Sequence, residues 1–322
     1  MPYTRPFAGR FIAPLAAVAL LSAPLATAQE PRGQTLRVDV NLVLLEATVK
    51  DKSGHVMGDL KKEDFVLDED GTPQKIEHFS RDEIPLAVAL VVDLSSSIQP
   101  FIRPLRYATL TALKSLKPED EVALFTFSSD VERRVALTHD KRDVSDQIES
   151  FETGGSTDIN DAVYEAARYL ARARPSARRV IVLVSDNVPS GRHMYSPEDV
   201  VNAALEADAA VYGLKVPGQN PWEARVAAKA RGMLNVERTA QETGGEVFDI
   251  EKEGSLYVAF QALIERLKTR YTVGFYSTLG VSRPGFHKLN LRLQPSFGRS
   301  GRDYTILSKN GYYPAGSRAS TR

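Results

Sequence analysis

Three oxygen-bearing side chains follow an apolar run in the first half of the chain. Asp93, Ser95 and Ser97 occupy alternate positions directly after Leu86–Val92, whose uninterrupted apolar character predicts a buried β-strand. A helical pattern follows, so these residues would lie at the carboxyl end of a strand, where open α/β sheets bind ligands. Hard oxygen donors without nitrogen or sulfur suit Mg²⁺ or another hard divalent cation. Serine-rich turns after strands are common, so a metal site requires more oxygen ligands from later loops.

Two later segments supply such oxygens. Thr157 follows Gly154-Gly155 and precedes a predicted helix at 158–173, where the simpler reading of this residue alone is a helix cap. Asp186 follows a second apolar strand at 179–184, and here the alternative is an Asx-turn. In a parallel sheet both strand ends lie at one edge, and the N-terminus of the helix points to that edge. We therefore predict that five residues converge there: Asp93, Ser95, Ser97, Thr157 and Asp186.

The order and spacing of these residues resemble the von Willebrand factor A (VWA) family. The resemblance spans roughly 84–268, and the matching segments are Asp93-x-Ser95-x-Ser97, Gly154-Gly155-x-Thr157 and Leu183-Val184-Ser185-Asp186. It implies a Rossmann-like, doubly wound α/β fold with a mainly parallel sheet, a metal-ion-dependent adhesion site (MIDAS) and a non-catalytic role in ligand binding. It also implies direct metal contacts from Ser95 and Ser97, a direct or water-mediated contact from Thr157, and partly water-mediated contacts from both aspartates.

Such a site leaves its cation under-neutralised, because most of the direct ligands are neutral hydroxyl groups. We expect Mg²⁺, with Mn²⁺ or Ca²⁺ as alternatives, and we expect an Asp or Glu of a partner protein to complete the coordination. The sequence departs from the family pattern at Asn187, where glycine is usual. Asparagine tolerates left-handed backbone better than other non-glycine residues do, so the turn should persist.

The only tryptophan, Trp222, lies in the segment 217–234, which follows a predicted strand at 209–216 and should reach the same sheet edge. Tryptophan is a favoured interface anchor, so Trp222 and Asn187 are candidates for the ligand surface. The alternative is that Trp222 packs a helix at 223–233 against the domain.

Composition and the N-terminus limit the possible classes of protein. The 322 residues are 43% hydrophobic and 25% charged, as in ordinary globular proteins. Lys+Arg and Asp+Glu both number 41, so the charge gives no indication of a nucleic-acid or membrane-surface partner. Arg5 and Arg10, an apolar stretch at 11–25 and Ala26-Thr27-Ala28 are typical of a secretory signal peptide, 1–28, with an uncleaved anchor as the alternative.

The export prediction has further consequences. We expect a periplasmic or secreted protein with no integral membrane segment in the mature chain. Because the chain has no cysteine, it cannot be a lipoprotein, and thiol catalysis and thiolate metal sites are excluded.

The remaining chain divides by its hydrophobic pattern. Residues 29–83 have a β-rich pattern, residues 84–268 alternate predicted strands with helices, and residues 269–314 return to a β pattern. We expect residues 315–322 to form a disordered tail. The apolar strands of 84–268 indicate a mainly parallel sheet covered on both faces. Each β segment is too short to bury much core alone, so we expect one composite β module. It should contain strands at 36–42 and 44–49, and a hairpin at Asp70-Gly71 between strands at 65–67 and 75–79.

Both β segments also resemble exported bacterial A-domain proteins of the kind abundant in acidobacteria. The similar stretches are Asp39–Leu45, Lys62–Phe65, Asp70–Gln74, Tyr271–Tyr276 and Gly311–Tyr313. They imply no known activity.

Three functions are consistent with these features. The leading hypothesis is an exported module that binds a protein ligand through a divalent metal. The first alternative is a scaffold whose metal only stabilises the fold, and the second is a hydrolase that uses Mg²⁺-activated water. The five histidines form no ligand pair at helical spacing, and the sequence contains no nucleophile elbow, P-loop or dinucleotide motif. We therefore expect that the protein is not an enzyme.

Overall fold

The computed structural model of the chain describes residues 41–81, 84–174, 176–188, 193–218, 232–251, 255–277, 279, 283–295 and 304–314. The described residues all belong to one compact unit, Asp39–Arg322. The predicted signal peptide 1–28, Trp222 and the predicted tail 315–322 lie outside the described residues. No helix among the described residues is long and apolar enough to span a membrane.

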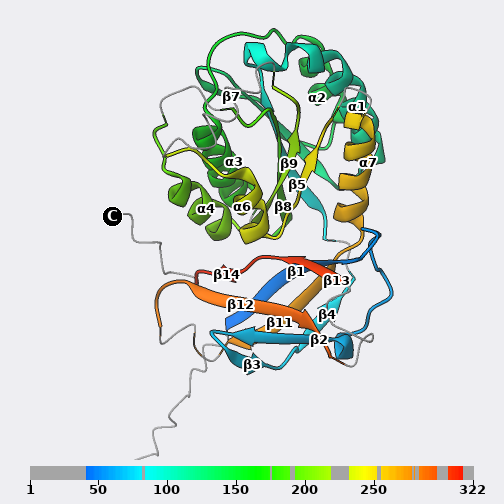
Figure 1. Cartoon of the computed structure of the whole chain (residues 1–322), viewed down its shortest axis with the longest axis vertical. Coiled ribbons are helices and arrows are strands. Elements are labelled where there is room, and N and C mark those ends of the chain that lie inside the picture. The colour runs from blue at the N-terminus through cyan, green and yellow to red at the C-terminus, as the bar shows by residue number, and fades with distance from the viewer. Residues whose placement is uncertain are drawn as a thin grey trace, which may run out of the picture. The chain divides into compact units, whose positions relative to one another are not determined.

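A six-stranded sheet forms the centre of the α/β part (Figure 1). Neighbouring strands are parallel, except that β6 and β7 are antiparallel. In spatial order the strands are β10 (Val247–Asp249), β9 (Ala209–Lys215), β8 (Arg178–Ser185), β5 (Leu86–Asp93), β6 (Glu121–Phe127) and β7 (Val131–Thr138). The predicted mainly parallel sheet is therefore confirmed. Because the chain continues from β5 to one side and later adds β8 on the other, a crevice is expected at the carboxyl ends of these two strands.

Side chains of the central strands alternate between two cores, because successive residues of a strand point to opposite faces. In β5 the even-numbered residues from Leu86 to Val92 enter one core, and the odd-numbered residues from Ala87 to Val91 enter the other. The first core is covered by α1 (Ile102–Ser115), α2 (Lys141–Glu149) and α7 (Ser255–Lys268). The second is covered by α3 (Ile159–Ala173), α4 (Pro197–Glu206) and α6 (Val236–Thr243) (Figure 1). Burial on both faces explains the continuous apolar runs in the sequence.

Polar residues at the helix ends explain where two of the helices begin and end. The Ser196 hydroxyl accepts a hydrogen bond from the Asp199 amide at 3.2 Å, while the Asp199 carboxylate accepts from the Ser196 amide at 3.0 Å, which is a capping box for α4. Asn235 accepts from the Arg238 amide at 2.8 Å at the start of α6, and Gly244 ends this helix with a φ of 84°. The sequence pattern did not predict α6, because its short length and polar exposed face give a weak helical period.

The β segments from both sides of the α/β part combine into two four-stranded sheets with antiparallel pairing. The first contains β13 (Tyr304–Ser308), β1 (Asn41–Asp51), β11 (Tyr271–Ser277) and β4 (His78–Ser80). The second contains β14 (Gly311–Tyr312), β12 (His287–Leu293), β2 (Phe65–Glu69) and β3 (Thr72–Gln74), and a short 3₁₀ helix, η1 (Lys62–Asp64), precedes β2. Each sheet joins strands from both segments, and side chains of both sheets share one core, as expected for a composite module.

The β strands differ in detail from the sequence-based expectations. β1 is one strand of 11 residues, whereas the pattern suggested two strands within 36–49. The hairpin at Asp70-Gly71 is present, and the φ values of 48° and 82° there explain the choice of these residues. Its second strand is β3, while 78–80 pair with β11 in the other sheet, because the chain leaves the hairpin after Gln74.

A buried carboxylate connects three strands of the β module. Glu69 at the end of β2 is fully buried and accepts hydrogen bonds from the Tyr312 hydroxyl at 2.6 Å and the Ser277 hydroxyl at 2.8 Å. Ser277 ends β11, and Tyr312 lies in β14. Since a buried carboxylate is costly without donors, these two bonds hold C-terminal strands against the N-terminal hairpin.

We expect Tyr312→Phe to lower the free energy of unfolding by about 1–3 kcal/mol, because it removes a donor to a buried charged group and leaves the ring in place. Chemical denaturation of the two proteins would measure this difference. The matched control is Tyr276→Phe, since Tyr276 is half-exposed on β11 and its loss of a hydroxyl should cost little stability. Equal stability of Tyr312→Phe and the unaltered chain would contradict the role given to Glu69.

Candidate metal site

Asp93 is the last residue of β5 and is fully buried, with 0% of its surface exposed. Its Oδ1 accepts a hydrogen bond from the Ser95 amide at 2.8 Å, and its Oδ2 accepts from the Ser185 hydroxyl at 2.7 Å. Ser185 ends the neighbouring strand β8, which pairs with β5 in parallel register through Val92 and Val184. The first carboxylate is thus fixed by its own loop and by the adjacent strand.

The two serines of the first loop lie at the start of a 3₁₀ helix, η2 (Ser96–Phe101), which leads into α1. Ser95 is buried and Ser97 is half-buried, and their Oγ atoms are 3.0 Å apart. Two ligands at right angles on Mg²⁺, each about 2.1 Å from the ion, would be separated by about 3.0 Å. The hydroxyl pair therefore has the spacing of neighbouring positions in an octahedral magnesium site.

The second loop is attached directly to the first. The Gly154 amide donates to the Leu94 carbonyl at 2.7 Å, so the backbone of the glycine pair lies against the residue that follows Asp93. Gly155 has a φ of 85°, and a Cβ there would be 2.8 Å from Ser129 Oγ, so a side chain would clash with the loop after β6. The close approach that the glycines permit is thus to neighbouring loops. Thr157, two residues later, is buried just before α3.

The third loop carries Asp186 directly after β8. Asp186 is buried, and its Oδ1 accepts from the Val188 amide at 2.9 Å, which is the Asx-turn considered as the alternative. The turn and a ligand role are compatible, because a carboxylate oxygen has more than one lone pair. Gly218, after β9, lies so close that a Cβ there would be 3.1 Å from Asp186 Oδ2.

Asn187 has a φ of 56°, so the left-handed turn expected at this position is confirmed. Its amide donates to Ser185 Oγ at 3.0 Å, while the same hydroxyl donates to Asp93. A single hydroxyl thereby links the carboxylate of one loop to the backbone of the next. The sequence motif contains Ser185 but indicates no role for it, because only the pairing of β5 with β8 brings its hydroxyl to Asp93.

The electrostatics of the site follow from its burial. Burial raises the pKa of the Asp93 carboxyl to about 6, and the charge of Asp186 adds to this effect, while hydrogen bonds from Ser185 and Ser95 oppose it. Two carboxylates close enough to influence each other repel without a counterion. A divalent cation between the loops would relieve this repulsion and keep Asp93 ionised.

The first turn of α3 holds the backbone of two nearby loops at this edge of the sheet, which we call the rim of the site. The buried Asn160 donates from Nδ2 to the carbonyls of Tyr195 and Gly232 at 2.9 and 3.0 Å, and its Oδ1 accepts from the Leu234 amide at 3.1 Å. The Asp161 carboxylate accepts from the amides of Met194 and Tyr195, both at 3.0 Å. Nothing in the sequence distinguished these residues from an ordinary helix start.

A second pair stands beside Thr157. Nδ1 of His193 is 2.8 Å from Oδ1 of Asp158, and both side chains are mostly buried. Its Nε2 is buried and has no hydrogen-bond partner among the described residues. The sequence gave no reason to pair these two residues, which are 35 positions apart.

The structure therefore places all five predicted residues on three loops at the carboxyl edge of one sheet. Those loops are connected through Leu94–Gly154 and through Ser185. The donor set is two carboxylates and three hydroxyls, which fits a hard divalent cation. No group of three or more His, Asp or Glu side chains within the described ranges is arranged to hold a metal ion. Candidate Trp222 falls in the undescribed stretch 219–231, so its role stays a prediction.

These features define an α/β protein of the doubly wound class, with a cluster of oxygen-bearing side chains at the carboxyl ends of β5 and β8. Residues 88–189 match the family model described as von Willebrand factor type A domain. The chain thus contains a von Willebrand factor type A domain, as the sequence resemblance indicated. None of the curated proteins compared with the chain matches it.

Three solved structures illustrate what the chain is similar to. An aerotolerance-related membrane protein from Bacteroides fragilis is 17% identical, with a TM-score of 0.42 over 56% of this chain and 99% of that chain. The vWF domain of the type V pili tip protein Mfa5 from Porphyromonas gingivalis is 11% identical, with a TM-score of 0.46 over 58% and 96%. Proximal thread matrix protein 1 from the mussel byssus, with a zinc-occupied MIDAS motif, is 16% identical, with a TM-score of 0.45 over 62% and 49%.

We expect Ser185→Ala to weaken divalent-metal binding by about 10- to 100-fold, because it removes the hydroxyl that orients Asp93 and anchors the Asn187 turn. Titration calorimetry with Mg²⁺ and Mn²⁺ would measure the change. Ser150→Ala is the control, since this exposed hydroxyl donates to the Gln147 carbonyl at the end of its own helix. An unchanged dissociation constant in Ser185→Ala would show that the bridge is not needed for the site.

Metal binding should also weaken as the pH falls through about 6, the raised pKa of Asp93. Above this pH the carboxylate is already ionised, whereas below it a proton must leave before the cation binds. The affinity is then expected to fall by up to about tenfold per pH unit. Calorimetry at a series of pH values would detect this slope, and an affinity that stays constant from pH 7 to about pH 5 would contradict it.

Proposed function

We propose that this domain binds Mg²⁺ through Asp93, Ser95, Ser97, Thr157 and Asp186, and that an Asp or Glu of a partner protein completes the coordination. The observation that carries the proposal is the linkage of the three loops: the Ser185 hydroxyl donates to Asp93 at 2.7 Å, and the Ser95 and Ser97 hydroxyls lie 3.0 Å apart. When bound, the cation would supply a positive charge and an open coordination position. The residues of the chain hold that position at a sheet edge.

The charge of the site supports a carboxylate of the partner protein as the remaining metal ligand. Asp93 uses one oxygen to accept from the Ser95 amide and the other to accept from the Ser185 hydroxyl, so its charge is already shared with two donors. The three hydroxyl donors are neutral. A divalent cation in this setting is poorly neutralised by the chain itself, and a carboxylate from another molecule is the natural complement.

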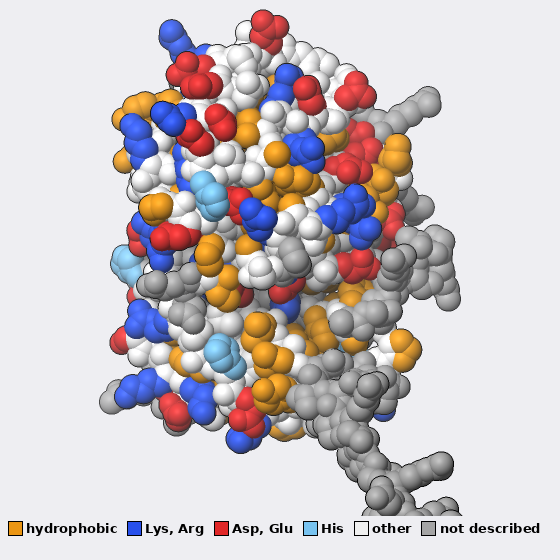
Figure 2. Space-filling view, turned by 180° about the vertical axis from the view of Figure 1, so that it is seen from behind, with side chains coloured by type: hydrophobic (Ala, Val, Ile, Leu, Met, Phe, Trp, Pro, Cys, Tyr) orange, Lys and Arg blue, Asp and Glu red, His pale blue; other side chains and the backbone are white. Residues whose placement is uncertain are grey.

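The rim of the site supports a protein as the partner. Met194 is 79% exposed, yet its backbone amide is held by Asp161 and its neighbour His193 contacts Asp158. An apolar side chain on a backbone held by the first turn of α3 offers contact area at a low entropic cost. On the face in Figure 2, basic and acidic side chains are interspersed over the described surface, which favours a protein over a nucleic acid.

The scaffold and hydrolase alternatives make different demands. A scaffold would gain stability from the metal and bind no external acid. A hydrolase needs a general base near the metal, and the His193–Asp158 pair, in which Asp158 follows Thr157 in the chain, is a candidate for that role. Its Nε2 atom is buried, so the pair is closed to a substrate and instead joins two loops. We therefore propose a binding protein and not an enzyme.

The site of action follows from the N-terminal sequence. The basic start, the apolar stretch at 11–25 and the Ala26-Thr27-Ala28 segment support export to the periplasm or beyond. The partner would accordingly be a protein of the cell envelope or the medium.

The decisive experiment is capture of partner proteins from native envelope extract on the immobilised chain, first in Mg²⁺ and then in excess EDTA. We expect the captured proteins to be released by the chelator. Asp186→Asn should reduce capture at least about tenfold, since it keeps the side-chain shape and the turn but removes one charge from the metal. Asp59→Asn, on an exposed residue of the β module, is the matched control.

Three results would count against the proposal. Capture that persists in EDTA would exclude a metal-mediated contact. A metal-dependent rise in melting temperature without any capture would favour the scaffold. Turnover of a phosphoester or ester that depends on Mg²⁺ and on Asp186 would favour the hydrolase.

A further inference from the structure

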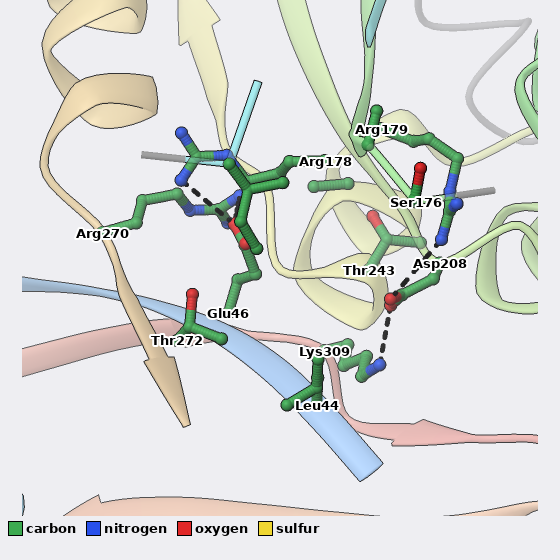
Figure 3. A pocket seen from close by; sticks show the side chains of 13 residues that line it. Leu44, Glu46, Ser176, Arg178, Arg179, Asp208, Thr243, Arg270, Thr272 and Lys309 are labelled. Carbon is green, nitrogen blue, oxygen red and sulfur yellow. Dashed lines mark hydrogen bonds and ion pairs between the residues drawn. The ribbon is translucent and has the colours of Figure 1, made fainter. Parts of the chain in front are cut away.

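A cavity of about 190 Å³ lies at the amino end of the parallel sheet, opposite the edge that carries Asp93. Its walls come from the starts of β8 and β9, from the end of α6 and from strands β1 and β11 of the β module (Figure 3). The charged residues that line it are Glu46, Arg178, Arg179, Asp208, Arg270 and Lys309. Four cations and two acids thus face a small space between the two parts of one compact unit.

On one side of the cavity two guanidinium groups share a single carboxylate oxygen. Glu46 Oε2 is 3.2 Å from Arg270 Nη1 and 3.4 Å from Arg178 Nη1. Arg270 also donates to the Thr48 hydroxyl and the Gly244 carbonyl, at 3.2 and 2.8 Å. The Arg178 Nη2 donates to a carbonyl of α7, while its Nε is buried with no partner among the described residues.

The opposite side repeats this arrangement. Asp208 Oδ1 accepts from Lys309 Nζ at 2.6 Å, and its Oδ2 is 3.7 Å from Arg179 Nη2. Figure 3 shows Arg179 and Lys309 converging on Asp208, and Arg178 and Arg270 converging on Glu46. Each acid serves two cations, so four positive charges minus two negative charges leave an excess of two among the described lining residues.

The four cationic side chains of the cavity are largely shielded from water. The side chains of Arg178, Arg179, Arg270 and Lys309 are 9%, 11%, 2% and 10% exposed. Uncompensated charges with so little hydration are costly. A neighbouring cluster also has two cations for one acid, because Glu246 pairs with both Lys50 and Arg266. Glu246 does not line the cavity and so adds no negative charge there.

We propose that this cavity binds a small multivalent oxyanion of the phosphate class. Its volume of about 190 Å³ equals roughly six water molecules at about 30 Å³ each, and is below the roughly 300 Å³ at which pockets for larger organic ligands begin. A phosphate-sized group carries up to two negative charges, which matches the excess. Exposed Ser176 and the half-exposed Asp208 side chain border the cavity and give the anion a path from solvent.

The bound anion would strengthen the contact between the α/β part and the β module. Arg178, Arg179 and Asp208 belong to the α/β part, whereas Glu46 and Lys309 belong to the β module. An anion that contacts cations from both parts would strengthen their attachment without contact to the metal edge. This site is therefore independent of the proposed magnesium function.

The test uses inorganic phosphate as the probe, with the purified full chain in EDTA so that no metal contributes. Melting temperature is followed against phosphate concentration, with chloride replacing phosphate at constant ionic strength. We expect a saturable rise on the order of 5 °C when phosphate exceeds its dissociation constant about 100-fold, and little effect from chloride.

Variants of opposite charge separate binding from a purely structural role. Arg179→Gln should weaken phosphate binding about tenfold, and Asp208→Asn should strengthen it about tenfold and make the melting temperature more dependent on phosphate. Lys309→Gln serves if Arg179→Gln does not fold. The controls are Arg292→Gln and Asp68→Asn, which change the charge equally at a partly exposed ion pair between β12 and β2.

The outcomes are distinct. A saturable phosphate response that moves in opposite directions in the two cavity variants, and not in the controls, supports the site. A response that never saturates, or that is equal in all variants, reflects general salting-out and overturns the proposal. Equal melting temperatures in phosphate and chloride would mean that the chain neutralises its own cations, which also overturns it.

Discussion

The parallel pairing of β5 with β8 is the constraint on which the candidate metal site depends. Val92 lies opposite Val184 in this register, so the next residues of the two strands, Asp93 and Ser185, meet at the sheet edge. The Ser185 hydroxyl then donates to the Asp93 carboxylate at 2.7 Å, and both residues are fully buried. A shift of one residue would turn Asp93 toward the opposite face of the sheet, because side chains alternate along a strand. Register thus decides whether the loops share a site.

The same sheet carries opposite charges at its two ends. The carboxyl edge gathers the buried acids Asp93 and Asp186, while the amino edge gathers Arg178 and Arg179 with cations of the β module. Both groups are held in low-dielectric surroundings, where unbalanced charge is costly. A divalent cation at one edge and a small oxyanion at the other are the complementary ligands, so one electrostatic principle accounts for both proposed sites.

The β module explains why the two ends of the described chain return to one place. β1 pairs with β11 and β13, and the buried Glu69 of β2 accepts hydrogen bonds from Ser277 and Tyr312. These contacts join residues more than 200 positions apart. Each β segment is too short to bury a core alone. The two segments flank the α/β part in the sequence, and they form one core together.

The sequence by itself determined the order of the α/β elements other than α6, the left-handed turn at Asn187 and the five oxygen-bearing residues at strand and helix ends, since apolar runs and turn residues are local signals. Tertiary structure alone decided the Ser185 bridge, the Asn160 and Asp161 contacts at the rim, the His193–Asp158 pair and the cation-lined cavity. These features join residues that are distant in the chain or polar residues with an ordinary local role. Their partners are set by strand register and helix packing, which leave no periodic trace in the sequence.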